Sequence, residues 1–570
     1  MRWLFRSQTL LNPPPEAELA ERAGQLEISP LLARILWQRG LHGFEAMRAF
    51  LNPSLQGLAP LEDWPGLTRA AEVLAASLLG GCKLCVWGDY DVDGITATAL
   101  VLDFLAAHGF SAQSHIPDRI GEGYGLNKQG ISQLAAQGVN LLLTVDCGIS
   151  DHEAVAHAKA LGMTVIVSDH HLPAETLPPA DALVNPRLAD CPCPALAGVG
   201  VAFLLMAALN NALVRAGRTR YDVRRLLDLV ALGTLADVVD LNGQNRILVK
   251  NGLLKIAGGD RVGIAALKTA CNFAPNAALG AGQVVFTLAP RINAAGRLGS
   301  SMVALELLLT EDRGRAADLA AELSRLNAER REEEERILTG ALLQAEQQAQ
   351  AGRMGLVLHS PDWHPGIIGI VASRVVERLH RPAVVLCSTG AFLKGSGRSV
   401  PGFDMHEAFS RCSDFFLGFG GHTMAAGLSL ESAMLAPFRE RFNQLAAQGL
   451  GGSPVEAECK IDGDLGFEAV DFQFLKELEM LQPFGMGNPE PVFASPPVRI
   501  KNMRGRPGFM LLDLEDESSG RTLQAKAWRQ LADIPATLRG KRIRIAYTPR
   551  IDRYNGAATV ELRLKDWKEA

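Results

Sequence analysis

The sequence lacks the features that direct a chain into or across a membrane. No uncharged run that is apolar throughout reaches the roughly 18 residues of a membrane span. Residues 1–8 contain no long apolar stretch of the kind found in secretory signals. We therefore expect a cytoplasmic protein without a membrane partner.

An excess of one charge and a framework of paired cysteines are also missing. The net charge is −5, so the overall balance does not attract nucleic acid and any basic surface must be local. The cysteines number nine, and their close pairs have no second pair at zinc-finger spacing. Several fall in or just after apolar runs, as small buried side chains do. The cysteines thus indicate a reducing compartment and no zinc site.

The sequence does contain a repeated alternation of strand and helix patterns. Its 570 residues are enough for roughly three or four domains. From about residue 65, short apolar runs alternate with helical patterns, which is typical of a parallel α/β sheet. Strands are expected at 83–87, 111–116, 141–145 and 163–167.

We divide the chain into five parts. They are an N-terminal helical segment (1–64), an α/β domain (65–310), a connecting helix (311–352), a second α/β domain (353–454) and an OB-like β-barrel domain (455–570). The connector is charged, rich in Ala and Leu and free of proline, which predicts a long exposed helix. A self-associating coiled coil is the competing interpretation, but the apolar spacing is broken in its middle.

Three aspartates, Asp89, Asp91 and Asp93, stand at alternating positions just after the first expected strand. Carboxylates this close repel one another, so a chain keeps them together only where they face water or a cation. Hard oxygen ligands of this kind suit Mg²⁺ or Mn²⁺. The other interpretation is an acidic turn in which an aspartate caps the next helix.

Further potential metal ligands follow later apolar segments. They are Asp146 after 141–145, Asp169, His170 and His171 after 163–167, and Asp237 after an apolar segment that starts at Leu229. Because ligands of open α/β sheets bind beyond the carboxyl ends of the strands, these side chains should meet at one edge of the sheet. Carboxylates and imidazole at one edge fit a two-metal site. Taken singly, Asp146 is also explained by a helix-capping turn and His171 by a loop histidine.

The second half of the chain offers two possible nucleic-acid surfaces. Residues 394–399 and 418–427 read as glycine-rich loops, whose N–H groups could approach phosphate, or as ordinary turns. Beyond residue 455, five short strands are expected at 498–503, 509–514, 522–528, 543–547 and 559–564, a number that suggests an OB-like barrel.

Basic and aromatic residues are interleaved along these five strands. The basic ones are Arg499, Lys501, Arg504, Arg506, Arg539, Lys541, Arg542, Arg544, Arg550 and Arg553, and the aromatic ones are Phe509, Trp528, Tyr547 and Tyr554. A basic groove with aromatic platforms suits single-stranded nucleic acid. A solvated barrel whose aromatic residues belong to the core is the alternative interpretation.

Four motifs in chain order resemble those of the DHH phosphoesterase superfamily. They are residues 89–94, 145–150, 169–171 and 236–240. Residues 117–126 and 290–299 are similar to further motifs of the bacterial RecJ family within it, the single-strand-specific 5′→3′ DNA exonucleases. Residues 364–369 and 420–427 resemble the DHHA1 domain that accompanies DHH domains. The resemblance to RecJ spans roughly residues 65–570.

The resemblance implies a set of site residues. Two divalent cations, Mn²⁺ or Mg²⁺, would be held by Asp91, Asp93, Asp146, His170 and Asp237. Asp89 and His171 would lie behind the ligands or on the substrate side, with His171 counted among the catalytic residues. The residues implied to bind DNA are Arg119, Ser396 and Arg398 at the 5′ phosphate, and Arg291 and His422 at the backbone.

The resemblance also implies a monomeric enzyme of DNA repair and recombination that degrades single-stranded DNA, with a single-strand-binding protein and a RecQ-type helicase as partners. Two alternatives stay open. A DHH phosphoesterase that acts on short oligonucleotides, cyclic dinucleotides or pyrophosphate would share the metal motifs but would generally lack the β-rich tail. A non-catalytic DNA-binding scaffold would have lost metal ligands, whereas all the expected positions are filled here.

Overall fold

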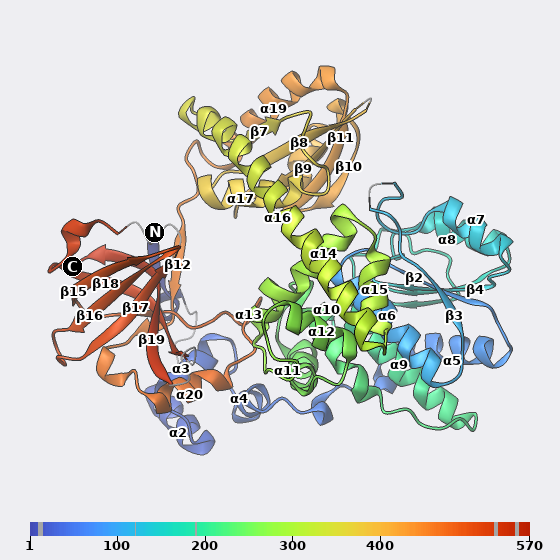
Figure 1. Ribbon diagram of the computed structural model, residues 1–570, viewed down its shortest axis with the longest axis horizontal. Helices are drawn as coiled ribbons and strands as arrows, with labels where there is room; N and C mark the ends of the chain where they lie inside the picture. The colour runs from blue at the N-terminus through green and yellow to red at the C-terminus, as the bar shows by residue number, and fades with distance from the viewer. Residues whose placement is uncertain (10–14, 120, 189–190, 391, 529–533, 553–557) are drawn as a thin grey trace.

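The computed structural model describes residues 1–570 except 10–14, 120, 189–190, 391, 529–533 and 553–557. Two α/β domains are joined by the long helix α16 (Arg313–Gln350), and a β barrel lies to one side of them (Figure 1). At 1.5 Å per residue, the 38 residues of α16 span about 57 Å. Its first part packs on α12 (Val262–Ala270) and α14 (Ala289–Leu298), and its later part on α17 (Ile368–Leu379). The predicted helical connector is thus confirmed.

The first domain is built on a parallel sheet with the strand order β3-β2-β4-β5-β6. The strands are β2 (Leu84–Gly88), β3 (Ala112–His115), β4 (Leu141–Val145), β5 (Thr164–Ser168) and β6 (Ala182–Val184). Strands β2 and β4 are buried throughout, as expected of apolar runs covered on both faces. The first four strands match the predicted ones, and β6 was not predicted.

Helices cover both faces of this sheet. One face packs on α5 (Pro65–Leu79), α6 (Val92–Ala107), α9 (Gly198–Arg215) and α10 (Leu227–Ala236), and the other on α7 (Lys128–Ala136) and α8 (His152–Ala160). Helix α9 is long and apolar enough to cross a membrane, but 78% of its most apolar window is buried inside the protein. It packs on α5 and α6, so its apolarity is that of a core helix.

The second domain has the strand order β10-β11-β9-β8-β7. Its strands are β7 (Leu356–His359), β8 (Ala383–Thr389), β9 (Phe392–Arg398), β10 (Phe416–His422) and β11 (Ala425–Leu430). The prediction of glycine-rich loops at 394–399 and 418–427 was therefore wrong, because these residues form most of β9 and β10 and the first half of β11. Glycine serves packing here: a Cβ at Gly395 would lie 2.7 Å from the Leu386 side chain of the neighbouring strand.

The C-terminal domain contains all five predicted strands. They are β15 (Val498–Arg506), β16 (Phe509–Asp516), β17 (Thr522–Trp528), β18 (Arg542–Asp552) and β19 (Thr559–Glu569). The order β18-β15-β16-β17-β19 closes into a ring through pairing of β18 with β19. Closure leaves these strands without a free sheet edge, which is the expected OB-like barrel.

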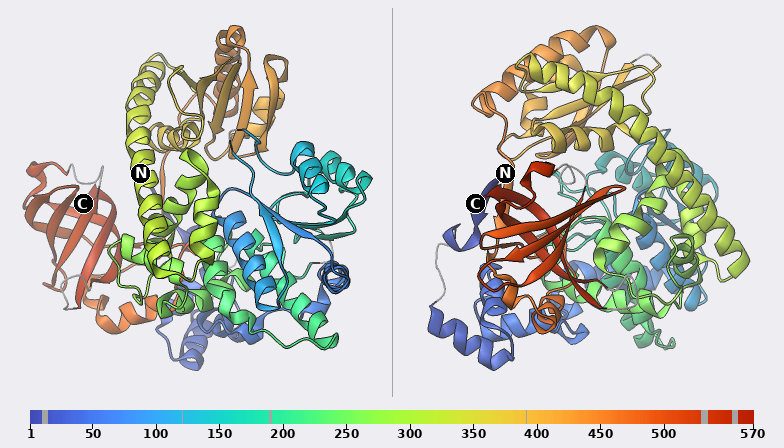
Figure 2. Two further views of the ribbon diagram at one scale, coloured as in Figure 1. Left: turned by 45° about the vertical axis from the view of Figure 1, so that its right-hand side comes forward. Right: turned by 60° about the vertical axis from the view of Figure 1, so that its left-hand side comes forward.

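The N-terminal segment packs on this C-terminal barrel. Helices α2 (Glu16–Leu26), α3 (Pro30–Gln38) and α4 (Phe44–Leu51) share one apolar core with the barrel strands, as their adjacency in Figure 2 illustrates. Strand β1 (Arg2–Phe5) pairs in parallel with β12 (Glu458–Ile461). The sequence pattern of the first 60 residues predicted packed helices. It predicted neither strand β1 nor the packing of the helices on the C-terminal barrel.

Candidate metal centre and phosphate-binding surface

The carboxyl ends of three neighbouring strands bring the predicted acidic and imidazole groups together. Three sets of side chains have ligand atoms within 4.8 Å of one another: Asp89, Asp91 and Asp146; Asp93, His170 and Asp237; and Asp146, His170 and His171. The sets share Asp146 and His170, so they form one continuous cluster. The predicted meeting of these residues at one edge of the sheet is confirmed. We call this cluster the acidic rim.

Backbone geometry fixes the first motif within the rim. Asp91 is the N-cap of α6, and its Oδ1 accepts hydrogen bonds from the N–H groups of Asp93 and Gly94 at 2.9 and 3.1 Å. Helix capping and metal binding therefore do not exclude one another here. The two carboxylate oxygens of Asp93 accept from the N–H groups of Gly198 and Val199 at 2.7 and 2.9 Å. The first N–H groups of α9 have no partner within the helix, so they are free to donate to Asp93 and to orient its carboxylate.

Gly198 is a functional position that the sequence reading missed. A Cβ there would lie 2.5 Å from Asp146 Oδ1, so only glycine lets α9 approach the rim this closely. The Gly-Val-Gly sequence at 198–200 was the available signal. Asp146 itself has φ 64, a left-handed conformation that follows directly after β4 and turns its carboxylate into the rim.

His170 lies at the centre of the rim. Its Nε2 is 3.1 Å from Asp146 Oδ1 and 3.9 Å from Asp93 Oδ2, and its Nδ1 is 3.7 Å from Asp237 Oδ2. Burial and then the neighbouring His171 lower the pKa of His170 to about 4. The imidazole is therefore neutral at physiological pH, which is the form that binds metal ions.

Asp169 holds the two histidines of the rim in place through hydrogen bonds. Its Oδ1 accepts hydrogen bonds from the N–H groups of His170 and His171, and its Oδ2 from that of Ile149. The same Oδ1 is 2.8 Å from His171 Nδ1. Burial lowers the pKa of His171, but the hydrogen bond and charge of Asp169 outweigh it and raise that pKa overall. Tyr124 was missed from sequence, and its hydroxyl lies 3.0 Å from the same ring nitrogen.

Four buried polar atoms of the rim have no hydrogen-bond partner among the described residues. They are Asp89 Oδ1, Asp146 Oδ1, His170 Nε2 and Asp237 Oδ2; the 3.1 Å contact between His170 Nε2 and Asp146 Oδ1 does not have the geometry of a hydrogen bond. Burial and then the charges of neighbouring aspartates raise the pKa of Asp93 to about 7 and that of Asp237 to about 9. Buried charges are stable only when they are paired or coordinate a metal. Orphaned carboxylate oxygens together with a neutral imidazole are a donor set that fits Mn²⁺ or Mg²⁺.

The rim predicts a pH-dependent stability of the metal-free protein. Because the pKa values of Asp93 and Asp237 lie above the ordinary 3.8, the folded chain holds more protons than the unfolded chain between these values. Stability must then fall as the pH rises through this window. We expect the melting temperature in EDTA to drop by at least about 2–4 °C from pH 6 to pH 9, the shift that 1 kcal/mol causes in a domain of this size.

Saturating Mn²⁺ should abolish most of this decline, because a bound cation replaces the protons. Differential scanning calorimetry at several pH values, with EDTA or Mn²⁺, measures both curves. Parallel curves under the two conditions would show that the rim carboxylates do not bind the cation.

A second cluster consists of arginines from both α/β domains. Arg119 lies over the ring of Tyr90, 4.9 Å from its centroid. In the sequence Tyr90 stands between Asp89 and Asp91, the first two aspartates of the rim. Burial and then Arg119 lower the pKa of Arg398, and burial followed by Arg119, Arg330 and Arg398 lowers that of Arg297 to about 10. Arginines that depress one another's pKa in a buried place form a site for an anion.

This cluster spans the boundary between the two domains. Ser396 accepts a hydrogen bond from Arg398 Nη1 at 2.9 Å, and Arg297 Nη1 donates to the Gly366 carbonyl of the second domain at 2.8 Å. Arg119, Ser396 and Arg398 were predicted together, whereas Arg297 was noted only as part of its motif. We call Arg119, Arg297, Ser396 and Arg398 the arginine pocket.

The two remaining predicted DNA contacts lie apart from these clusters. Arg291 donates to Ser324 Oγ of α16 at 3.1 Å and to the Thr287 carbonyl at 2.6 Å. His422 ends β10, exposed, opposite Ala425, which in turn pairs with Arg398. Two strand spacings of about 4.8 Å therefore separate the His422 and Arg398 backbones. His422 is thus in register with Arg398 of the arginine pocket, two strands away in the same sheet.

The barrel surface is less basic than its sequence suggested. Six of the predicted basic residues form ion pairs with acidic neighbours: Arg499, Lys501, Arg504, Arg542, Arg544 and Arg550. The prediction of Tyr547 as a stacking platform was wrong, because its side chain is fully buried. Trp528 is 42% exposed and stacks on Phe509 with ring centroids 4.7 Å apart. Arg553 and Tyr554 lie outside the described residues.

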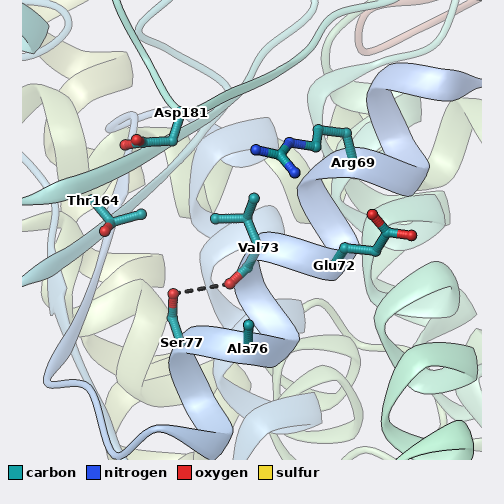
Figure 3. Close-up of a pocket in the computed structure, with 7 residues that line it drawn as sticks. All are labelled: Arg69, Glu72, Val73, Ala76, Ser77, Thr164 and Asp181. Atoms are coloured by element: carbon teal, nitrogen blue, oxygen red, sulfur yellow. Dashed lines mark hydrogen bonds between the residues drawn. The ribbon is translucent and has the colours of Figure 1, made fainter.

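A pocket of about 420 Å³ lies beside the amino ends of the strands of the first sheet (Figure 3). Its lining comes from α5, from Thr164 at the start of β5, and from Asp181 just before β6. It is therefore at the amino ends of the strands, opposite the acidic rim. Asp181 is already paired with Lys159 Nζ at 2.7 Å. This pocket contains none of the predicted site residues.

Comparison with family models matches three parts of the chain. Residues 83–234 match the DHH family N-terminal domain, residues 352–448 the DHHA1 domain and residues 461–566 the RecJ OB domain. Each of the two α/β domains and the barrel domain thus contains a matched segment.

Curated relatives and solved structures agree with these matches. The chain is 42% identical over 487 residues to the single-stranded-DNA-specific exonuclease RecJ of Salmonella typhimurium, covering 82% of this chain and 83% of the relative. Against the RecJ of Thermus thermophilus the identity is 40% over 484 residues, with 85% and 68% covered. A crystal structure of Thermus thermophilus RecJ in complex with Mn²⁺ aligns with a TM-score of 0.84 and 33% identity over 100% of this chain and 80% of that one. The Mg²⁺ complex aligns with a TM-score of 0.77, 32% identity and coverages of 100% and 78%.

Proposed function

Because this chain belongs to the RecJ family of single-stranded-DNA-specific exonucleases, we propose that it degrades single-stranded DNA from the 5′ end by hydrolysis at the acidic rim. It is a metal-dependent single-stranded DNA exonuclease that uses Mn²⁺ or Mg²⁺. The orphaned carboxylate and imidazole atoms of the rim carry the assignment of the metal site.

The proposed ligands are the five residues implied by the motifs: Asp91, Asp93, Asp146, His170 and Asp237. Two divalent cations bound there would neutralise charge on the scissile phosphate and lower the pKa of a bound water. Asp93 is pre-oriented by the N–H groups of α9, so it need not reorganise when a cation binds. Asp169 holds His171 by Nδ1, which leaves Nε2 of that ring available to a cation or to the substrate. Asp89 contributes a further carboxylate oxygen beside Asp146.

The polarity of digestion follows from the arginine pocket. Three arginines and a hydroxyl offer charge-assisted hydrogen bonds that suit a terminal phosphate better than an internal one. Arg119 contacts Tyr90, which stands between Asp89 and Asp91, so a phosphate in this pocket would lie beside the rim. A 5′-terminal phosphate bound there would present the adjacent phosphodiester to the acidic rim. Arg291 and His422 are proposed to contact the backbone of the same strand.

The barrel and the cellular setting complete the proposal. Trp528 offers an exposed aromatic face, and base–aromatic stacking is tolerant of sequence. Exposed ion pairs contribute little to stability, so arginines on the barrel can exchange carboxylates for phosphates at low cost. We propose a cytoplasmic monomer that acts in repair and recombination together with a single-strand-binding protein and a RecQ-type helicase.

Digestion of end-labelled oligonucleotides tests the proposed function. Single strands and duplexes, each with a 5′ phosphate or a 5′ hydroxyl, are incubated with Mn²⁺, with Mg²⁺ or with EDTA. We expect stepwise loss from the 5′ end of the single strand alone, and none in EDTA. Cleavage restricted to two- to five-nucleotide substrates would instead indicate a small-substrate phosphoesterase, and binding without cleavage would indicate a scaffold.

A further inference from the structure

A tight turn of the C-terminal domain lies against the loop that follows Asp237. The 485–488 turn is closed by hydrogen bonds from Gly485 N–H to the Asn488 carbonyl at 2.9 Å and from Asn488 N–H to the Gly485 carbonyl at 3.2 Å. The Leu241 N–H donates to the Met486 carbonyl at 2.9 Å. Nearby, Asn242 Nδ2 donates to the Gly487 carbonyl at 3.3 Å, across 245 residues of sequence.

The two glycines of the turn permit this close approach. A Cβ at Gly485 would lie 2.6 Å from Leu241 Cδ1. Gly487 has φ +68, and a Cβ there would lie 2.7 Å from Asn242 Nδ2 and 2.9 Å from the Asp240 carboxylate. Any other residue at 487 would therefore displace the side chains of Asp240 and Asn242, and with the latter the hydrogen bond between Asn242 and Gly487.

The turn is held rigidly in its place. Asn488 is fully buried and donates through Nδ2 to the carbonyls of Leu481 and Pro483 at 2.8 and 2.7 Å. Arg246, on helix α11 (Gly243–Gly258) just beyond the loop, is 1% exposed and donates to four backbone carbonyls. Those carbonyls belong to Phe50, Met480, Leu481 and Gln482. The turn and the start of α11 thus form one fixed unit.

The loop itself is strained next to the metal ligand. Val238 has φ 63, a left-handed conformation that β-branched residues avoid, and its side chain is 55% exposed. Such a conformation is unfavourable and persists only where the surroundings enforce it. Exposure shows that packing of the Val238 side chain does not enforce it. The described contacts that hold the loop include the hydrogen bonds that Leu241 N–H and Asn242 Nδ2 donate to the 485–488 turn, and one that Asn245 Nδ2 donates to the Asp240 carbonyl at 3.0 Å.

We propose that the 485–488 turn is a positioning element for Asp237, by which the C-terminal domain fixes the loop that follows this residue. This inference rests on the proposed function only in taking Asp237 as a metal ligand. Asp237 lies at the end of α10, one residue before the strained position, and its Oδ2 is 3.7 Å from His170 Nδ1. A displacement of the loop would move this carboxylate out of reach of a cation shared with His170.

The test compares Gly487→Ala with Gly508→Ala by Mn²⁺ binding. Both glycines have positive φ, +68 and +82, but nothing lies within 4 Å of a Cβ at Gly508. The two substitutions therefore share the backbone strain and differ in the clash with the side chains of Asp240 and Asn242. Electron paramagnetic resonance of free Mn²⁺ measures the affinity of each purified protein without DNA. We expect Gly487→Ala to bind about 10–100-fold more weakly, the usual effect of disturbing a ligand's supporting contacts, and Gly508→Ala to match the unaltered protein.

Asn242→Ala provides a milder variant for the case in which Gly487→Ala does not fold. Asn242 makes no side-chain capping bond to α11, so the substitution removes the hydrogen bond to Gly487 and leaves the helix start intact. Loss of one hydrogen bond of about 1 kcal/mol predicts roughly fivefold weaker Mn²⁺ binding. Unchanged Mn²⁺ affinity in Asn242→Ala, or in a folded Gly487→Ala, would overturn the proposal.

Asp237→Asn separates this inference from the proposed function. If Asp237→Asn binds Mn²⁺ as the unaltered protein does, the ligand assignment itself is wrong. If Asp237→Asn loses affinity while the turn variants keep it, the ligand assignment stands and the positioning role falls. Binding of a single-stranded oligonucleotide in EDTA should be the same for all of these variants, because none of them changes the arginine pocket.

Discussion

Asp146→Asn should reduce the rate of single-strand digestion by at least about 10³-fold, because a cation that loses a central ligand forfeits several kcal/mol of transition-state stabilisation. Asn suits the test since it keeps the size of the side chain and tolerates the left-handed φ of 64 at this position. Gel analysis of a 5′-labelled oligonucleotide under single-turnover conditions with Mn²⁺ measures the rate.

The same substitution should stabilise the metal-free protein. Burial and then the charges of the other rim aspartates raise the pKa of Asp146, so removal of its carboxylate relieves repulsion. Asp181→Asn is the matched control, because Asp181 lies at the opposite edge of the same sheet, in the pocket of Figure 3. We expect Asp181→Asn to digest DNA normally. An active Asp146→Asn, or an inactive Asp181→Asn that is fully folded, would contradict the assignment of the acidic rim.

Arg398→Ala should remove the preference for a 5′-phosphorylated substrate. A hydrogen bond to a charged group contributes about 1.5–3 kcal/mol, so kcat/KM on a 5′-phosphorylated strand should fall about 10–100-fold. On a strand with a 5′ hydroxyl the same substitution should change kcat/KM little, because the partner of Arg398 is then absent. Competition between the two substrates in one reaction measures the ratio directly.

Arg353→Ala is the control for this experiment. Arg353 belongs to the same domain but pairs with Glu440, away from the arginine pocket, so its loss removes one charge without touching the pocket. It should leave the ratio of the two substrates unchanged. Equal losses on both substrates in Arg398→Ala would assign Arg398 to general backbone binding and not to the 5′ end.

The acidic rim was predictable because two regularities act together in this chain. Strands of a parallel sheet end at one edge, and Asp91, Asp146 and His170 each stand within three residues of the end of such a strand. Their proximity was thus a consequence of topology and did not depend on side-chain detail. The five barrel strands were found for a similar reason, since turn residues separate short β-branched and apolar runs. The roles of the individual ligands came from the family resemblance and stay predictions.

What could not be predicted depended on contacts between distant segments. Gly198 orients Asp93 from 105 residues away, and no local pattern encodes that pairing. Glycine-rich segments of the second domain were read as loops, because glycine disfavours strands in isolation. In the folded domain, Gly395 gives the neighbouring Leu386 room, so tertiary packing overrides propensity. Tyr547 was read as a platform because sequence does not tell the inner face of a barrel strand from its outer face.

The parallel pairing of β1 with β12 has a consequence for the order in which the protein folds. Arg2 aligns with Glu458, so β1 cannot form its pairing until residues about 450 positions later have been synthesised. The first α/β domain can fold meanwhile, since its sheet lies within one continuous stretch. The N-terminal helices then expose the apolar surface that the barrel later covers. Until the barrel has formed, this surface is open to chaperone binding and to aggregation.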